Sequence, residues 1–156
     1  MSDAKQILKE VDALVAARAS RPDWLKETCA LLQRERSHYN WVGIYFLEEN
    51  ELVLGPFVGA PSPHTRIPLD QGICGAAARE GKTVIVPDVK ADPRYLACSL
   101  ETKSEIVVPL EHDGRILGEL DIDSHTPNAF TAQDSELLQQ VALRLAPVLA
   151  REKVKT

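Results

Sequence analysis

The segment 104–124 constrains the fold of this chain more than any other stretch. Its sequence is Ser-Glu-Ile-Val-Val-Pro-Leu-Glu-His-Asp-Gly-Arg-Ile-Leu-Gly-Glu-Leu-Asp-Ile-Asp-Ser. Two apolar runs rich in β-branched residues, 106–110 and 116–122, flank the dipeptide Asp113-Gly114, which tolerates the positive φ angles of a tight turn. The segment therefore predicts a β-hairpin whose strands are suited to a protein core.

Acidic residues interrupt this apolar hairpin. Asp121 and Asp123 are two residues apart and therefore share one face of a strand, and Glu105 lies near the start of the other strand. A strict two-residue turn would pair Glu105 with Ile122 and place it on the opposite face. We expect a bulge with Gly114 in the left-handed conformation to add one residue and bring Glu105 opposite an aspartate. The three acids would then form the floor of a polar pocket, although exposed aspartates at a strand end would give the same pattern.

The composition limits the class of protein. With 156 residues, the chain is long enough for one domain with a real core and too short for two ordinary domains. It has no apolar run near the roughly 20 residues that cross a bilayer, and it begins without the apolar stretch of a secretory signal. Since neither a membrane span nor a secretory signal is found, we expect a globular cytoplasmic protein. Its formal net charge of −5 argues against a nucleic-acid partner.

The rest of the chain alternates between helical and strand patterns. Helices are predicted where apolar residues recur at the helical period or alanines cluster, over 3–19, from a break at 20–23 to about 35, over 70–81 and over 131–153. Strands are predicted where β-branched and aromatic residues dominate, over 39–47, 52–58 and 83–86, and 66–68 is expected to be extended. Successive hairpins imply an antiparallel sheet with helices on one side, which is an α+β fold. We expect a single domain, 1–156, with N-terminal helices in 1–36, the sheet, short helix and a lid loop in 39–124, and a C-terminal helix in 131–153.

The strand over 39–47 has two chemically different faces. Val42, Ile44 and Phe46 form an aliphatic face suited to helices, whereas Trp41 and Tyr45 point to the other side. These two aromatic side chains either contact a ligand or are simply part of the core.

The three cysteines differ in their surroundings. Their odd number and wide spacing in a reducing compartment argue against a disulfide scaffold. Cys29 lies on an apolar helical stripe and is expected to be inert packing. Cys74 lies in the first turn of the short helix, where the helix dipole would lower its pKa, although a small packed residue fits equally well. Cys98 lies on the long loop 87–102, so it can approach a pocket and then a partner thiol.

Seven short motifs occur together in this chain. They are Asn40-Trp-Val-Gly-Ile-Tyr45, Leu54-Gly-Pro-Phe57, Arg66-Ile-Pro68, Gly72-Ile-Cys-Gly75, Ala97-Cys98, Ser104-Glu-Ile-Val-Val-Pro-Leu110 and Leu120-Asp-Ile-Asp-Ser124. In this order the motifs resemble the free methionine-(R)-sulfoxide reductases, a single-domain branch of the GAF superfamily, over roughly residues 40–150. The resemblance implies a GAF-like antiparallel sheet, with the N- and C-terminal helices on one face and a ligand pocket on the other.

The resemblance also implies an activity, the reduction of free L-methionine (R)-sulfoxide to methionine. The family's attacking cysteine corresponds to Cys98 and its resolving cysteine to Cys74, which together would form a disulfide. The implied substrate-binding residues are Glu105, Asp121, Asp123, Trp41 and Tyr45. A further family cysteine before the Arg-Ile-Pro motif is replaced here by His64-Thr65. No bound cofactor or metal is implied; the reductant would be an external dithiol such as thioredoxin, and the protein would be a homodimer through its terminal helices.

The chemistry of the residues agrees with this activity. A sulfoxide sulfur becomes a useful electrophile only when its oxygen is protonated, so the site needs a proton donor as well as a thiolate. Crowded carboxylates such as Glu105, Asp121 and Asp123 hold a proton to higher pH, while an ionised neighbour can bind the substrate's ammonium group.

Two alternatives remain open at the level of sequence. The first is a GAF sensory module that binds a small ligand without chemistry, because a fold does not determine an activity. The second is a zinc site from Cys74, Cys98, His64 and His112, although no pair of these residues has close ligand spacing.

Overall fold

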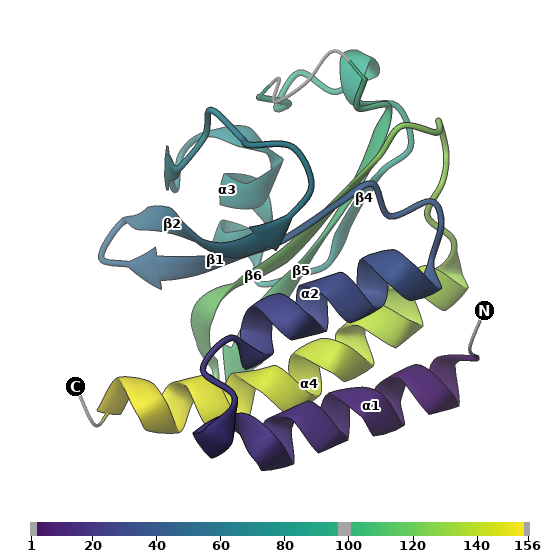
Figure 1. The fold of residues 1–156 in the computed structure, drawn as a ribbon. Coiled ribbons are helices and arrows are strands. Elements are labelled where there is room, and N and C mark those ends of the chain that lie inside the picture. The colour runs from purple at the N-terminus through teal and green to yellow at the C-terminus, as the bar shows by residue number, and fades with distance from the viewer. Residues whose placement is uncertain (1–2, 97–100, 155–156) are drawn as a thin grey trace.

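The computed structural model describes residues 3–96 and 101–154, and Figure 1 shows its fold. The helices are α1 (Ala4–Ala17), α2 (Trp24–Glu35), α3 (Gly72–Glu80) and α4 (Ala132–Val154), with short 3₁₀ helices η1 (Arg18–Ser20) and η2 (Val89–Ala91). The strands are β1 (Trp41–Glu48), β2 (Glu51–Val58), β3 (Arg66–Pro68), β4 (Val84–Val86), β5 (Ser104–His112) and β6 (Arg115–Ser124). The predicted order of helices and strands is confirmed.

The strands form one six-stranded sheet in the order β3-β2-β1-β6-β5-β4, and each neighbouring pair is antiparallel. The hairpin of β5 and β6 lies inside the sheet, as its apolar composition requires, with β1 beside β6 and the edge strand β4 beside β5. The α+β fold is confirmed. None of the helices in the described ranges has the length and apolarity to cross a membrane.

Helices cover both faces of the sheet (Figure 1). The layer of α1, α2 and α4 covers one face, where Val42, Ile44 and the β6 residues Leu120 and Ile122 are fully buried. The short helix α3 covers the other face, in a second apolar cluster that includes Trp41, Tyr45, Ile73, Cys74 and Val107. The alternation along each strand thus separates a purely apolar layer from a layer that contains polar groups.

The register of the central hairpin agrees with the prediction, but the bulge lies elsewhere. Glu105 is opposite Asp123, as expected from a one-residue shift. The turn itself is a strict two-residue turn, with positive φ at both Asp113 (51°) and Gly114 (75°), as in a type I′ turn. The register shifts between Leu110 and Glu111, so the extra residue is on β6 beside Gly118. A side chain at position 118 would overlap the backbone of Tyr45, which explains why glycine follows the bulge.

Candidate active site

A row of acidic residues lines the α3 face of strand β6. Glu119, Asp121 and Asp123 alternate with the apolar Leu120 and Ile122, which point to the helical layer. Glu105, on β5, lies opposite Asp123 and joins the row. All four carboxylates are buried, with exposed fractions between 0% and 5%. The prediction that Glu105, Asp121 and Asp123 cluster is confirmed, and the exposed strand-end alternative is wrong.

Strand β1 supplies the neighbours on the other side of this row. Trp41 is opposite Asp123, Gly43 is opposite Asp121, and Tyr45 is opposite Glu119. Because Gly43 has no side chain, the Trp41 ring can lie over it; a Cβ at this position would overlap that ring. Trp41 therefore lies close to the aspartates and covers the space beside Asp121.

Both aromatic side chains are held in place by further contacts. Trp41 stacks on Phe57 with a centroid separation of 5.6 Å, and its Nε1 donates a hydrogen bond to the Ala60 carbonyl at 2.9 Å. The Tyr45 hydroxyl donates to the His64 carbonyl at 2.9 Å. Both rings also line the cavity described below, so they belong to the core and contact the pocket at once.

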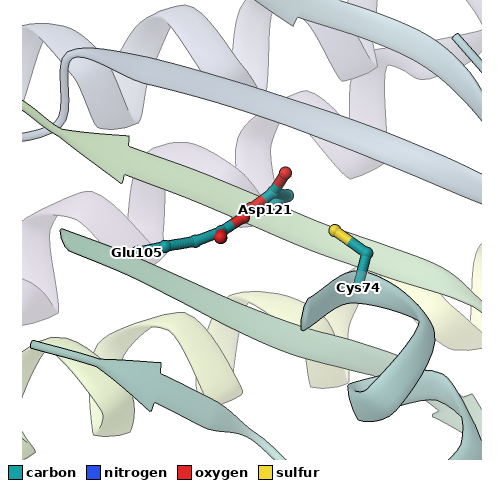
Figure 2. Close-up of side chains that lie close together, drawn as sticks. All are labelled: Cys74, Glu105 and Asp121. Carbon is teal, nitrogen blue, oxygen red and sulfur yellow. The ribbon is translucent and has the colours of Figure 1, made fainter. Parts of the chain in front are cut away.

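Cys74 approaches the carboxylates from the opposite side. It lies in the first turn of α3, and Figure 2 shows its sulfur pointing toward Asp121, with Glu105 reaching Asp121 from the neighbouring strand. The ligand atoms of Cys74, Glu105 and Asp121 all lie within 4.8 Å of one another. The residues come from three separate elements, α3, β5 and β6, so only the folded chain brings them together.

The protonation of Cys74 differs from the prediction. Its position at a helix start predicted a lowered pKa, but the thiol is only 5% exposed. Burial raises its pKa well above the ordinary value, and the four surrounding carboxylates raise it further. Because desolvation and like charge outweigh the helix dipole here, Cys74 keeps its proton in the reduced, substrate-free protein.

The pKa values of the carboxyl groups on β6 are raised, like that of Cys74. Burial raises the pKa of Glu119, Asp121 and Asp123 above their ordinary values. The charge of Asp121 raises the pKa of Glu119 and Asp123 further, whereas a hydrogen bond with Glu105 partly offsets the rise at both aspartates. The cluster can therefore store protons that free carboxyl groups would have lost.

Several oxygen atoms of the cluster have no hydrogen-bond partner in the described part of the chain. They are both carboxylate oxygens of Glu119, Oδ1 of Asp121 and Oδ1 of Asp123. The Cys74 thiol is near enough to lower the pKa of Glu119 somewhat, yet neither Glu119 oxygen is in hydrogen-bonding geometry with it. Buried polar atoms are nearly always paired, so these oxygens indicate a site that a ligand completes.

A cavity of about 260 Å³ opens beside the aspartates. Its lining includes Trp41, Tyr45, Asp121, Asp123 and Thr102. The volume is below the roughly 300–1,000 Å³ typical of pockets for drug-sized ligands, so it suits a molecule the size of one amino acid. Three larger hollows, of about 550, 570 and 1100 Å³, lie elsewhere and contain none of the site residues predicted from the sequence.

The comparisons with known proteins agree with this geometry. The GAF domain family matches residues 21–149. A protein named free methionine-R-sulfoxide reductase from Escherichia coli (strain K12) is 38% identical over 147 residues, which cover 94% of this chain and 88% of that protein. The chain belongs to the free methionine-(R)-sulfoxide reductase family of GAF-domain proteins.

Two solved structures of the family superpose closely on this chain. The reductase from Neisseria meningitidis, in complex with its substrate, has a TM-score of 0.91 at 36% identity and covers 100% of this chain and 96% of its own. A type II reductase from Thermoplasma acidophilum has a TM-score of 0.80 at 38% identity, covering 88% of this chain and 96% of its own. The predicted GAF-like fold is therefore confirmed.

Cys29 and the histidines of the zinc alternative lie outside the acidic cluster. Cys29 is fully buried on α2 in the helical layer, where burial raises its pKa to about 12, so its expected inert packing is confirmed. Cys98 lies outside the described residues. The cluster with metal-ligand geometry in residues 3–96 and 101–154 contains neither His64 nor His112, so the sequence alternative of a zinc site with these histidines has no support from the described residues.

Glu119 is the site residue that the sequence analysis missed. It precedes Asp121 by two residues, so the alternation that grouped Asp121 with Asp123 also places Glu119 on the same face. The family resemblance implied the other three carboxylates and not this one. Of the three acids on β6, Glu119 is the one absent from the cavity lining, and it is fully buried.

Proposed function

We propose that this protein reduces free L-methionine (R)-sulfoxide to L-methionine. The observation that carries the proposal is a small cavity whose lining combines two aromatic rings with buried, partly unpaired aspartates, next to a buried thiol. A protein of the same family was solved in complex with its substrate and superposes over the whole of this chain, which supports the assignment.

The carboxylates are proposed to bind the free amino group of the substrate. Asp121 and Asp123 each present one buried oxygen without a hydrogen-bond partner in the described chain, and Asp123 lies opposite both Glu105 and Trp41 in the sheet. An ammonium group would satisfy these oxygens and offset the concentration of negative charge. A methionine sulfoxide within a peptide has no such group, which supports selectivity for the free amino acid.

The same cluster is proposed to supply the proton that activates the sulfoxide. Burial holds protons on Asp121 and Asp123 to a higher pH than in free carboxyl groups. A protonated carboxyl can donate to the sulfoxide oxygen while an ionised neighbour binds the ammonium group. Trp41 and Tyr45 would pack against the S-methyl group of the substrate, which is apolar.

The cysteines are proposed to act in sequence. The Cys98 thiolate attacks the sulfoxide sulfur, oxygen is transferred, and the products are methionine and Cys98 sulfenic acid. The Cys74 thiol then attacks the sulfenic sulfur, so that a Cys74–Cys98 disulfide forms and water leaves. An external dithiol of the thioredoxin type reduces the disulfide to two thiols and is itself oxidised. No bound cofactor or metal takes part in this cycle.

The location of the cysteines supports Cys74 as the resolving thiol. The chain has three cysteines, and Cys29 lies in the helical layer behind the sheet. The described chain on both sides of Cys98 lies at the site: Leu96 lies against Gly72 at the start of α3, and Thr102 lines the cavity. Because His64 replaces a further family cysteine, Cys74 is the thiol that remains to form the disulfide.

The cellular setting follows from the same chemistry. The cycle needs a compartment that returns the disulfide to thiols, so we place the protein in the cytoplasm. We also infer a homodimer. The apolar stripes of α1 and α4 pack inside the protein's own core, but Leu143 of α4 (61% exposed) and Ile85 of β4 (38% exposed) border one hollow, where a second copy would cover them.

The decisive experiment is conversion of free methionine (R)-sulfoxide with excess dithiothreitol, beside the (S) epimer and a peptide-bound sulfoxide. Conversion of the free (R) form alone is expected. Cys98→Ser should abolish turnover, and Cys29→Ala should retain it. With thioredoxin as reductant, Cys74→Ser should form about one methionine per protein and then stop, because its sulfenic acid has no resolving thiol.

Other outcomes would contradict the proposal in distinct ways. Undiminished activity of Cys98→Ser would show that the nucleophile is wrongly assigned. No conversion of any substrate by the folded, reduced protein would favour a GAF module that only binds a ligand. Full turnover of Cys74→Ser with thioredoxin would show that another group resolves the sulfenic acid.

A further inference from the structure

The substrate-free cluster contains more negative and thiol groups than its described surroundings balance. No lysine or arginine is among the described residues that line the cavity. Glu119, which is 0% exposed, has no hydrogen-bond partner for either oxygen in the described ranges, and one oxygen of Asp121 is also unpaired. Each such buried group costs free energy until a positive ligand pairs with it. The cluster is thus suited to binding a cation.

The type of donor atom selects the type of cation. The atoms within 4.8 Å of one another are one cysteine sulfur and two carboxylate oxygens, from Cys74, Glu105 and Asp121 (Figure 2). Zn²⁺ takes this combination with bond lengths of about 2.3 Å to sulfur and about 2.0–2.2 Å to oxygen, which separates ligand atoms by roughly 3–4 Å. The spacing of at most 4.8 Å in the structure is close to this range. Mg²⁺ and Ca²⁺ prefer oxygen alone.

We propose that Cys74, Glu105 and Asp121 bind one Zn²⁺ ion in the reduced, substrate-free protein. A water molecule or a neighbouring carboxylate completes the tetrahedron. Binding requires the thiol to give up its proton, and the charge of the metal ion makes that possible. The site differs from the histidine-containing zinc site considered from the sequence, since it uses no histidine and does not need Cys98.

Zinc binding at this place inhibits the reductase, a consequence that rests on the proposed function. The ion occupies Asp121, one of the two aspartates proposed to bind the ammonium group, so it competes with the sulfoxide. It also holds Cys74 as a ligand, so the thiol cannot attack the Cys98 sulfenic acid. A chelator restores activity, because no covalent bond of the protein changes.

The binding experiment uses the full-length Cys98→Ser protein, reduced, and Co²⁺ as a spectroscopic substitute for Zn²⁺. One equivalent of Co²⁺ should produce thiolate-to-cobalt charge-transfer absorption, which Zn²⁺ removes and excess Mg²⁺ does not. Cys74→Ser in this background should lose the absorption. Asp121→Asn should weaken binding by at least about 10-fold, since even groups that only orient a metal ligand contribute about 10–100-fold. Cys29→Ala is the matched control and should bind as before.

The outcomes separate this inference from the proposed function. Absence of charge-transfer absorption in the folded protein would overturn the zinc site, as would absorption that survives Cys74→Ser or an unchanged affinity in Asp121→Asn. The readout is independent of turnover. A protein that binds the metal but reduces no sulfoxide would therefore refute only the proposed function, and an active protein that binds no metal would refute only the zinc site.

Discussion

A buried carboxyl group is tolerated when hydrogen bonds or an opposite charge replace its lost hydration, and Glu119 has neither within the described chain. It lies between Tyr45 and Pro109 on the neighbouring strands and is fully buried near Cys74. Burial raises its pKa well above the ordinary value, and the charge of Asp121 raises it further. Burial of Glu119 without a partner in the described chain therefore lowers the free energy of unfolding, while it adds a fourth acid to the site.

The first prediction concerns how Glu119 couples stability to pH. The native protein retains a proton that the unfolded chain releases above the ordinary pKa of 4.5, so the free energy of unfolding should fall as pH rises from there through the raised pKa. The fall is at most about 1.4 kcal/mol per pH unit for each retained proton. Glu119→Gln should make this slope shallower in urea unfolding between about pH 5 and about pH 8.

The control for this measurement is Glu111→Gln, which removes a carboxylate from an exposed position of β5. Its slope should remain close to that of the unmodified protein. Identical slopes for all three proteins would show that Glu119 does not hold its proton in the native state.

The second prediction concerns Gly43 and the wall of the cavity. An added methyl group would overlap the Trp41 ring and come within 3.1 Å of the Phe57 Cβ. Gly43→Ala should therefore displace Trp41 and lower kcat/KM for the free sulfoxide by about 10- to 100-fold, because small displacements of positioning groups have effects of this size. Gly114→Asn, in the distant turn, is the matched control, since asparagine tolerates positive φ. An unchanged kcat/KM in Gly43→Ala would show that Trp41 does not contact the substrate.

At the scale of elements, the start of α4 is joined to the chain before β1. Thr131 and Asp134 form a reciprocal capping pair: the Thr131 amide donates to Asp134 Oδ2 at 2.9 Å, and the Asp134 amide donates to Thr131 Oγ1 at 3.4 Å. Asp134 Oδ1 also accepts from the Tyr39 hydroxyl at 2.6 Å and lies 3.0 Å from His38 Nε2. One side chain therefore caps the helix and attaches it to the sheet.

The third prediction tests this connection. Asp134→Ala removes the carboxylate half of the capping pair, while the Thr131 hydroxyl remains, and leaves the hydroxyl of Tyr39, which is only 1% exposed, without its partner. Loss of part of a cap costs up to about 1 kcal/mol and an unpaired buried group about 1–3 kcal/mol, so unfolding should become easier by about 1–4 kcal/mol. Tyr39→Phe combined with Asp134→Ala should cost less than the sum of the single changes, measured by urea unfolding. Strict additivity would show that the two groups are not coupled.

At the scale of the whole molecule, the two faces of one sheet have different roles. The apolar layer beneath α1, α2 and α4 provides a rigid support, and the α3 face holds the acids, Cys74 and the aromatic wall. Because β6 alternates strictly beyond its bulge, it contributes to both layers without mixing them.

The fourth prediction concerns assembly. Leu143 and Ile85 are the large hydrophobic side chains exposed in the described part of the chain, and both border the hollow over β4, β5 and α4. Light scattering at micromolar concentration should give a dimer, and Leu143→Glu should shift the mass toward the monomer, because it places a charge in an apolar contact. Gln133→Glu, at an exposed position near the start of α4, controls for the added charge. A monomeric mass for the unmodified protein would refute the dimer.

Local patterns were enough to predict the helices, the central hairpin, the clustering of Glu105, Asp121 and Asp123, and the family. These features depend on periodicity along the chain and on turn chemistry, as in the Asp113-Gly114 turn. The position of the bulge depends instead on long-range packing, because the approach of the Tyr45 backbone to Gly118 comes from a strand distant in sequence. Tertiary contacts also set the protonation of Cys74 and the role of Glu119. Desolvation and the charges of residues on β5 and β6 act on that thiol and outweigh its own helix, and no local pattern encodes the sum of such long-range effects.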